Sequence, residues 1–319
     1  MYLLGFDIGG TKSAVVTAKW DGKNITVIKK QKTPTDKNIS PEEMIDKMIG
    51  MADSILDGSP DAIGIACGGP LDAERGVILS PPNLPGWDNI EVVKLIREHY
   101  GVPVTLQNDA NACALAEWRF GAGRGLKNMV FLTFGTGLGA GLILDGKLYD
   151  GTHGNAGEVG HVRLANDGPI GFGKRGSFEG FCSGGGIAQL GYSMALEALK
   201  KGVCPSYFKD GMSPDEVTAK SVGDAAEDGD ETALEVYRTA GRYLGRGLSL
   251  IIDILDPQAI VIGGIFTRSR ELLWQYAREE IAKEALLASA EGCAELPAKL
   301  GESIGDYSAI AIATLNLEV

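Results

Sequence analysis

The sequence predicts an α/β protein built from two similar halves, and three observations carry this prediction. Apolar segments of strand length alternate with segments of helical periodicity along the 319 residues, the order from which helix-covered sheets are made. A strand, a glycine-rich turn with a threonine and a second strand occur in this order near residue 2 and again near residue 129. Glycine contributes 45 residues, about twice its ordinary usage, without a collagen-like period. Because glycine has no side chain, this content indicates places where another group comes close to the backbone.

The first half is expected to begin with three antiparallel strands in a meander. Residues 2–8, 13–18 and 25–28 are apolar, and Asp21-Gly22 supplies a hairpin turn before the third strand. Strands and helices then alternate, with Ser40 and Pro41 marking the start of the first helix. The further elements expected in this half are helices over 41–56, 90–100 and 109–120 and strands over 61–66 and 102–106.

At residue 129 the pattern of the first half starts again. Strands are expected over 129–134, 139–144 and 147–149, with the Asp145-Gly146 turn before the last of them. Two such glycine-rich hairpins could face each other across a cleft and hold a polyphosphate from both sides. Ordinary hairpin turns are the alternative, although these need only one or two glycines. The other expected elements are a glycine-rich loop region over 151–186, helices over 185–200, 231–255, 270–288 and 307–315, and strands over 259–262 and 298–300.

The charge balance disfavours two classes of partner. Acidic residues outnumber basic ones by 42 to 30, which gives a net charge of −12 at neutral pH. Such a field repels nucleic acid phosphates and anionic membrane surfaces, so neither is expected as a partner. The same negative field also repels the polyphosphate of a nucleotide. A nucleotide site here would therefore depend on backbone N–H groups, Mg²⁺ and local lysines.

Cysteine usage and the first residues favour a cytoplasmic location. The five cysteines are scattered and never form a C-x-x-C pair, so we expect free thiols in a reducing compartment. The first residues have no basic segment followed by an apolar core of signal-peptide length. The apolar run over 248–255 is far shorter than the roughly 20 residues that a membrane span needs.

The first glycine-rich turn combines a carboxylate at a strand end with a hydroxyl and an ammonium. It contains Asp7, Gly9, Gly10, Thr11 and Lys12. Its backbone N–H groups and Thr11 can face phosphate oxygens while Asp7 holds Mg²⁺ through water. A turn in which Asp7 only caps the backbone is the alternative.

The second glycine-rich turn is the candidate for an opposing phosphate hairpin. It contains Gly135, Thr136 and Gly137, and it lacks both the Gly-Lys-Ser/Thr ending of a P-loop and the distant acid of a dinucleotide site. The strand over 259–262 ends in Gly263-Gly264, where adenosine could lie flat against the backbone. A plain tight turn is the alternative at this glycine pair.

Polar residues that could serve an attacking hydroxyl follow the strand over 102–106. Asn108 and Asp109 stand where this strand gives way to a helix, at the carboxyl end where α/β sheets place ligands. Asp109 could accept a proton, and Asn108 could orient the same substrate; helix capping is the alternative. Farther on, Glu158, His161 and Glu179 could bind the hydroxyls of a sugar, although His161 could equally be a lone surface histidine.

Taken together, these motifs resemble those of the ROK family of sugar kinases. The matching segments are residues 7–12, 108–111, 134–139, 158–161 and 301–310, so the resemblance spans nearly the whole chain. It implies an actin-like ATPase (ribonuclease-H-like) fold with two duplicated lobes around a central cleft. The lobes are expected to comprise residues 1–117 with 305–319, and residues 118–304. The resemblance also suggests a homodimer.

The resemblance further implies ATP and Mg²⁺ as cofactors and phosphorylation of a hexose, commonly at O6. By matching position, Asp109 is expected to be the general base. Asn108, Glu158, His161 and Glu179 are expected to bind the sugar, and Gly68 and Gly69 to line the site. Glucose is the first substrate expected. Fructose, mannose, allose or an N-acetylhexosamine remain alternatives because a preference at one hydroxyl depends on pocket shape.

Residues 170–179 depart from the family pattern. Ile170, Phe172 and Ser177 occupy the places where the family usually has three cysteines. These side chains are not zinc ligands, so the sequence predicts that structural zinc is absent. Ile170, Phe172 and Phe178 are expected to form a small apolar plug in its place.

Two other classes of protein share this fold. A sugar-sensing regulator of the same family would bind a sugar without catalysis and would carry a DNA-binding extension, which is not expected in this acidic chain. An actin-like ATPase that acts as a chaperone or filament would keep both phosphate turns, but it would not explain Asn108, Asp109 and the sugar-binding candidates.

Overall fold

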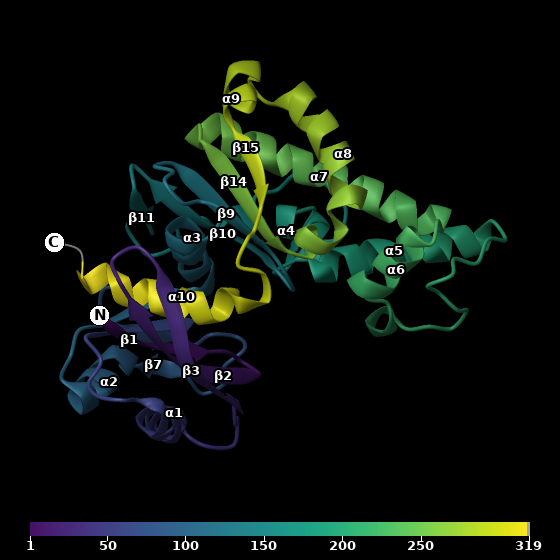
Figure 1. The fold of residues 1–319 in the computed structure, drawn as a ribbon. Coiled ribbons are helices and arrows are strands. Elements are labelled where there is room, and N and C mark those ends of the chain that lie inside the picture. Colours follow the sequence, from purple (N-terminus) through teal and green to yellow (C-terminus); the bar gives the residue numbers. More distant parts are fainter. Residues whose placement is uncertain (318–319) are drawn as a thin grey trace. The chain divides into compact units, whose positions relative to one another are not determined.

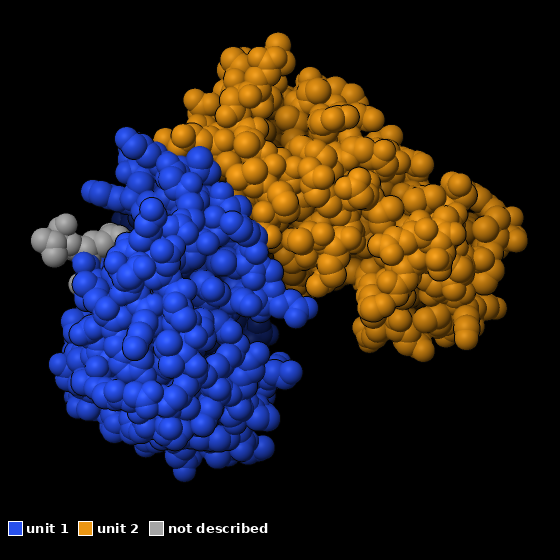
Figure 2. All heavy atoms as spheres, in the orientation of Figure 1, with its two compact units in different colours: residues 1–127, 141–156, 299–319 blue, residues 128–140, 157–298 orange. Residues whose placement is uncertain are grey.

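A computed structural model describes residues 1–317. The chain divides into two compact units (Figure 2): unit 1 consists of residues 1–127, 141–156 and 299–319, and unit 2 of residues 128–140 and 157–298. These units reflect internal contacts alone. The lobes expected from the sequence, residues 1–117 with 305–319 and residues 118–304, stay a prediction.

Unit 1 is built on a five-stranded sheet with the order β3-β2-β1-β4-β8. The first three strands form the expected antiparallel meander, whereas β1, β4 and β8 run parallel. Figure 1 shows the helices of this unit beside the sheet. The elements are β1 (Tyr2–Ile8), β2 (Lys12–Trp20), β3 (Ile25–Pro34), α1 (Pro41–Ile55), β4 (Ala62–Cys67), α2 (Val92–Tyr100), β8 (Val104–Asn108), α3 (Asp109–Phe120) and α10 (Ile304–Thr314).

The two faces of this sheet bury different helices, because successive side chains of a strand point to opposite faces. On β1, Leu4, Phe6 and Ile8 belong to a core cluster shared with α1 and α2. Leu3 belongs to a second cluster, which contains Ile310 of α10. The odd-numbered positions of β1 therefore face α10.

Two glycines let α10 approach the sheet closely. Gly5 of β1 and Gly64 of β4 are register partners. A Cβ atom on Gly5 would lie 2.7 Å from the Ala309 Cβ, and one on Gly64 would lie 2.0 Å from the Ala309 carbonyl oxygen. Any larger side chain would push the helix away from the sheet.

A second sheet repeats the topology of the first, although its strand β11 and the last four residues of β10 fall within residues 141–156, which belong to unit 1. The second sheet has the order β11-β10-β9-β14-β15, which matches β3-β2-β1-β4-β8 strand for strand, and β9, β14 and β15 are parallel. The duplication expected from the sequence is thus confirmed. The strands are β9 (Met129–Phe134), β10 (Leu138–Leu144), β11 (Lys147–Tyr149), β14 (Ala259–Gly264) and β15 (Ala294–Pro297).

Figure 1 shows two long helices of unit 2, α7 and α8, side by side next to β14. Helices α5 and α7 agree closely with the expected ranges, whereas α8 starts five residues before the expected 270, directly after Gly264. The expected strand over 298–300 is wrong. The strand lies at β15 because Ala294 to Pro297 pair with Ala259 to Ile262 of β14, so its place is set by a distant partner. The helices are α4 (Phe178–Phe181), α5 (Gly184–Lys200), α6 (Ala219–Glu227), α7 (Glu231–Leu255), α8 (Ile265–Glu284) and α9 (Leu287–Gly292).

Some elements were not expected from the sequence. Helix α6 starts behind a Thr218 cap whose hydroxyl accepts a hydrogen bond from the Ser221 N–H at 3.0 Å. A small antiparallel sheet in unit 1 is made of strands too short to show an alternating pattern. Its strands are β5 (Leu71–Asp72), β6 (Val77–Leu79) and β7 (Asp88–Ile90).

The cysteines and the helices bear on two further expectations. All five cysteines are free thiols, as expected. Within residues 1–317, none of the helices combines the length and the apolar character that a membrane crossing requires.

Candidate functional site

In unit 1, the carboxyl ends of three parallel strands bring together the residues expected to act on phosphate and hydroxyl. Ile8 of β1 is in register with Cys67 of β4, and Cys67 with Asn108 of β8. Gly9-Gly10, Gly68-Gly69 and Asp109 directly follow these three positions. A Cβ atom on Gly68 would lie 3.5 Å from the Asp109 Oδ2. The structure therefore places these three segments at one edge of the sheet.

The first glycine-rich turn is held in shape by Thr35. The Thr35 N–H donates to the Thr11 carbonyl at 3.0 Å, and its hydroxyl donates to the Gly9 carbonyl at 2.6 Å. A Cβ atom on Gly10 would lie 2.5 Å from the Asn83 carbonyl oxygen. The exposed side chains of Thr11 and Lys12 follow this tight turn, so they are available to a ligand.

Asp109 is solvent-exposed at the first position of α3. The protein atoms around its carboxyl nevertheless remove part of its hydration, which raises the pKa of Asp109 to about 6. A carboxyl with this pKa is mostly ionised at neutral pH and is a stronger base than an ordinary aspartate. Its position and its pKa suit the acceptance of a proton from a hydroxyl.

Asp7 has the most perturbed carboxyl at this sheet edge. Loss of hydration, followed by the charges of Asp109 and Asp306, raises its pKa to about 7, and Lys30 and Lys32 act in the opposite direction. A divalent cation would relieve this repulsion between carboxylates. Mg²⁺ typically uses one or two carboxylates together with water and phosphate oxygens, so the donor set around Asp7 fits it. Among residues 1–317, no three His, Cys, Asp or Glu side chains are grouped to hold a metal ion by themselves.

Asn108 serves as the cap of α3. Its Oδ1 accepts a hydrogen bond from the Asn111 N–H at 2.8 Å, which is the capping alternative considered for this residue. The cap uses only Oδ1, so the side-chain NH₂ group can still donate to a ligand. Capping and substrate orientation are therefore compatible in Asn108.

A relay of amides lies next to this cap and was missed by the sequence reasoning. The Asn111 Nδ2 donates to the Gln107 Oε1 at 3.1 Å, and the Gln107 Nε2 donates to the Asp150 Oδ2 at 3.3 Å. Asn111 is 0 % exposed and Gln107 is 6 % exposed. The relay links the first turn of α3 to residue 150, which precedes the Glu158 segment. Asn111 belonged to a recognised motif, but nothing in the sequence pointed to Asp150.

We expect Gln107→Leu to lower the free energy of unfolding by about 1–3 kcal/mol, because the buried Asn111 Nδ2 would lose its acceptor. Gln31→Leu is the matched control, since the Gln31 Nε2 donates to the Ser54 hydroxyl at 3.1 Å on the exposed surface. The control should change stability by less than about 0.5 kcal/mol. Urea unfolding of both variants provides the measurement. Equal effects at the two positions would show that the relay is not a special source of stability.

In unit 2, the second glycine-rich turn is bonded to the predicted sugar ligand Glu179. The Leu138 N–H donates to the Glu179 Oε2 at 2.9 Å, and a Cβ atom on Gly137 would lie 2.7 Å from the same oxygen. Gly137 thus leaves room for the carboxylate. This contact joins residues 41 positions apart, and the sequence contained no signal for it.

The Gly263-Gly264 pair lies beside the second turn. Gly264 is in register with Phe134, the last residue of β9. Its φ of +73° and the 2.1 Å that would separate a Cβ from the Phe134 carbonyl oxygen both require glycine. Helix α8 begins directly after Gly264, and the Gly184 N–H at the start of α5 donates to the Gly135 carbonyl at 2.8 Å. Two helix N-termini therefore begin beside these glycines, an arrangement that favours anionic ligands.

Glu158 directly precedes a short 3₁₀ turn that ends at His161, and both side chains are exposed. Between them, Gly160 would place a Cβ 2.2 Å from the Leu138 carbonyl oxygen and 3.3 Å from the Glu179 Cβ. The 158–161 segment thus lies against the second turn and Glu179. The rings of His161 and Phe172 lie in a T-shaped arrangement with their centroids 5.3 Å apart.

The apolar plug expected in place of the cysteines is wrong. Ile170 and Phe172 are 42 % and 73 % exposed, and only Phe178, at 1 %, is buried. Phe172 and Gly173 form the two-residue turn of a hairpin, with φ values of 42° and 75°, and this turn holds Phe172 away from the core. Phe178 instead occupies the space above Gly247, where a Cβ would lie 2.2 Å from its ring.

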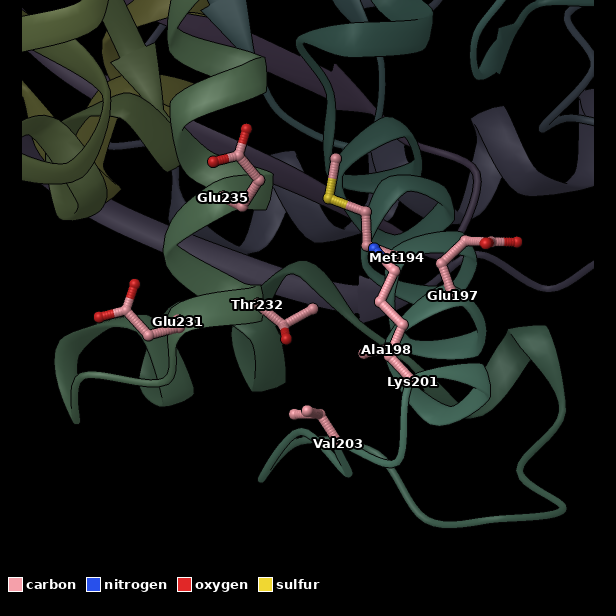
Figure 3. A pocket seen from close by; sticks show the side chains of 8 residues that line it. All are labelled: Met194, Glu197, Ala198, Lys201, Val203, Glu231, Thr232 and Glu235. Atoms are coloured by element: carbon pink, nitrogen blue, oxygen red, sulfur yellow. The ribbon is translucent and has the colours of Figure 1, made fainter.

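A pocket elsewhere in unit 2 contains none of the predicted site residues. It has a volume of about 420 Å³ and lies between α5 and the first turns of α7. Figure 3 shows Glu231 and Glu235 extending from one helix and Met194 from the other. Its acidic rim does not suit a phosphate ligand.

A sequence model of the ROK family matches residues 3–315. The chain belongs to the ROK family. This ROK chain is 34 % identical over 313 residues to the glucokinase of Thermotoga maritima, covering 97 % of this chain and 96 % of that protein. It is 31 % identical over 227 residues to a xylose repressor of Caldicellulosiruptor bescii, covering 71 % of this chain and 55 % of the repressor. Enzymes and regulators are therefore both among its relatives.

Solved structures of the ROK family establish the fold. A ROK family glucokinase from Streptomyces griseus, in complex with glucose and AMPPNP, superposes with a TM-score of 0.76 at 30 % identity, covering 99 % of this chain and 100 % of that one. The ROK chain has the actin-like ATPase fold, as expected from its sequence. The repeated strand order of its two sheets is the internal duplication of that fold.

Proposed function

We propose that this ROK chain is an ATP-dependent hexose kinase that transfers the γ-phosphate of ATP to a sugar hydroxyl, with O6 of glucose as the first candidate. The observation that carries the proposal is Asp109, a carboxyl with a pKa of about 6 that stands at the carboxyl end of β8, beside Gly68. Near-full-length similarity to a glucokinase supports the same function.

Asp109 is the general base in this proposal. It takes the proton of the acceptor hydroxyl while that oxygen attacks the γ-phosphorus in line, and ADP leaves. Asn108 and the backbone at Gly68-Gly69 orient the hydroxyl. The backbone of the first turn, with Thr11 and Lys12, binds phosphate oxygens.

Asp7 would hold Mg²⁺ through water, and the cation would offset negative charge on the phosphoryl oxygens when bound. Protons compete with the cation at this site because the pKa of Asp7 is about 7. Asp7 must therefore lose its proton before it can serve as a ligand.

The residues of unit 2 have two proposed roles. Gly135, Thr136 and Gly137 bind phosphate, and Gly263 and Gly264 leave space for the adenosine. Glu158, His161 and Glu179 bind the sugar hydroxyls. The packing of Gly160 against Leu138 and Glu179 supports the second role, since it keeps these groups in one neighbourhood.

Further features of the proposal are a cytoplasmic location, a homodimeric assembly and the absence of structural zinc. The replacement of three family cysteines by Ile170, Phe172 and Ser177 motivates the last point. A metal analysis of the purified protein tests it, and one tightly held zinc per chain would contradict it.

The proposed function is tested by ADP release with Mg-ATP and one sugar at a time. The panel consists of glucose, fructose, mannose, allose, N-acetylglucosamine and N-acetylmannosamine, beside a blank without sugar. We expect one sugar, glucose first, to raise turnover far above the blank. Sugar-independent turnover would favour an ATPase of another kind. Sugar binding without any turnover would favour the regulator, the second candidate suggested by similarity to a xylose repressor.

A further inference from the structure

Two lysines of β3 lie on the same face of the unit 1 sheet as Asp7. Asp7 is in register with Ala14 of β2, and Ala14 with Lys32 of β3. Register partners project to the same face, and neighbouring strands are about 4.8 Å apart. The small side chain of Ala14 is therefore all that separates Lys32 from Asp7 along this row.

Lys30 occupies the neighbouring row on this face. Its register partner is Val16, and the partner of Val16 is Gly5. Because a Cβ on Gly5 would meet Ala309 at 2.7 Å, this is the face covered by α10. Lys30 and Lys32 thus project toward α10, as Asp7 does.

The first turn of α10 contributes Asp306 to a cluster of charged side chains that also contains Asp7, Lys30 and Lys32. The Lys30 ammonium donates to the Oδ1 of Asp306, and these side chains are 24 % and 18 % exposed. The adjacent Gly305 would place a Cβ 3.3 Å from the Asp7 Oδ2. Asp306 therefore holds Lys30 at the end of the helix that touches Asp7.

The cluster brings like charges together in an acidic protein. The ammonium of Lys30 is the main cause that lowers the pKa of Lys32, and the ammonium of Lys12 has a smaller effect in the same direction. The carboxylate of Asp306 acts in the opposite direction. Repulsion between neighbouring ammonium groups is unfavourable unless an anion offsets it. In the whole chain, acidic residues outnumber basic ones and give a net charge of −12. Three lysines nevertheless gather beside the first glycine-rich turn.

We propose that Lys30 and Lys32 bind the terminal phosphates of the nucleotide beside Asp7, with Asp306 holding Lys30 in position. Ammonium groups are compact donors that suit phosphate oxygens. Positive charge that is already in position in the free protein stabilises the negative charge that develops during phosphoryl transfer. The identity of the anion rests on the proposed function. A long polyanion such as nucleic acid is disfavoured by the overall charge, whereas a short polyphosphate carries far fewer charges and a divalent cation neutralises part of them.

The test compares Lys32→Met with Lys29→Met. Lys29 lies on the same strand, but its ammonium pairs with the exposed Asp57 at 2.7 Å, so it serves as a matched control outside the cluster. Calorimetry measures the Kd of Mg-ATP and of AMP in the absence of sugar. We expect Lys32→Met to raise the Kd of Mg-ATP about tenfold or more and to change AMP binding little, since one charge-assisted contact to phosphate is lost. Lys29→Met should bind Mg-ATP like the unaltered protein.

Asp306→Asn provides a second variant, because asparagine can still accept the Lys30 hydrogen bond but attracts it less. We expect a smaller rise in the Kd of Mg-ATP than for Lys32→Met. The inference is overturned if Lys32→Met and Lys29→Met bind Mg-ATP equally well, if AMP is weakened as much as Mg-ATP, or if the unaltered protein does not bind Mg-ATP.

Failure of the proposed function would look different. If no sugar raises turnover but Lys32→Met weakens Mg-ATP, the phosphate site stands and the kinase proposal does not. If a sugar does raise turnover but Lys32→Met binds Mg-ATP normally, the kinase proposal stands and the phosphate site at Lys30 and Lys32 does not.

Discussion

Asp109→Asn is expected to lower kcat by about 10²–10⁴-fold, the usual contribution of a general base. Asparagine has nearly the shape of aspartate but cannot accept the proton of the acceptor hydroxyl. The sugar should still bind, since Asn108 and the neighbouring glycine backbone are unchanged. The Kd of the sugar is therefore expected to change far less than kcat.

ADP release and calorimetry with the same sugar measure the two quantities. Asp57→Asn is the control, because Asp57 is an exposed aspartate paired with Lys29, and it should leave kcat unchanged. Normal turnover in Asp109→Asn would remove this residue from the role of base.

The pH profile gives a second readout for Asp109. Its pKa of about 6 means that the carboxyl is ionised and able to accept a proton above pH 6. Protonation below that pH removes the base, so kcat/KM should fall as the pH is lowered through about 6. At saturating Mg²⁺, the residual activity of Asp109→Asn should lack this decrease. An unchanged profile in the variant would assign the decrease to another group.

Gly64→Ala is expected to destabilise the protein by about 3 kcal/mol, the upper end of the usual cost of overpacking. The new Cβ would lie 2.0 Å from the Ala309 carbonyl oxygen and 2.5 Å from the Ala313 nitrogen. Both are backbone atoms of α10, which cannot rotate away as a side chain can. Relief would require α10 to move off the sheet.

Gly50→Ala is the matched control for this substitution. Gly50 lies inside α1 and is exposed, and a Cβ there would meet no atom within 4 Å. Alanine should stabilise the helix by about 0.5–1 kcal/mol. Chemical unfolding of the two variants should therefore give changes of opposite sign. A small loss in Gly64→Ala would mean that α10 shifts at little cost.

Much of the fold and part of the site could be predicted from local patterns in the sequence. The two strand, glycine-turn, strand segments predicted the duplication that appears as one strand order in both sheets. Asn108 and Asp109 were expected at a strand end, and β8 ends at Asn108. These signals are local because alternation, caps and turns involve residues close in the chain.

Contacts between distant residues were decided only by the tertiary structure. Glu179 reaches the second turn through Leu138, Lys32 comes beside Asp7 through the register of three strands, and β15 lies where β14 pairs with it. Phe172 could not be placed without the hairpin that exposes it. Strand register and helix docking depend on packing across the whole domain. The sequence by itself therefore determined which chemical groups this ROK chain has and that its opening strand pattern is repeated, and the tertiary structure decided the strand order and which of those groups meet.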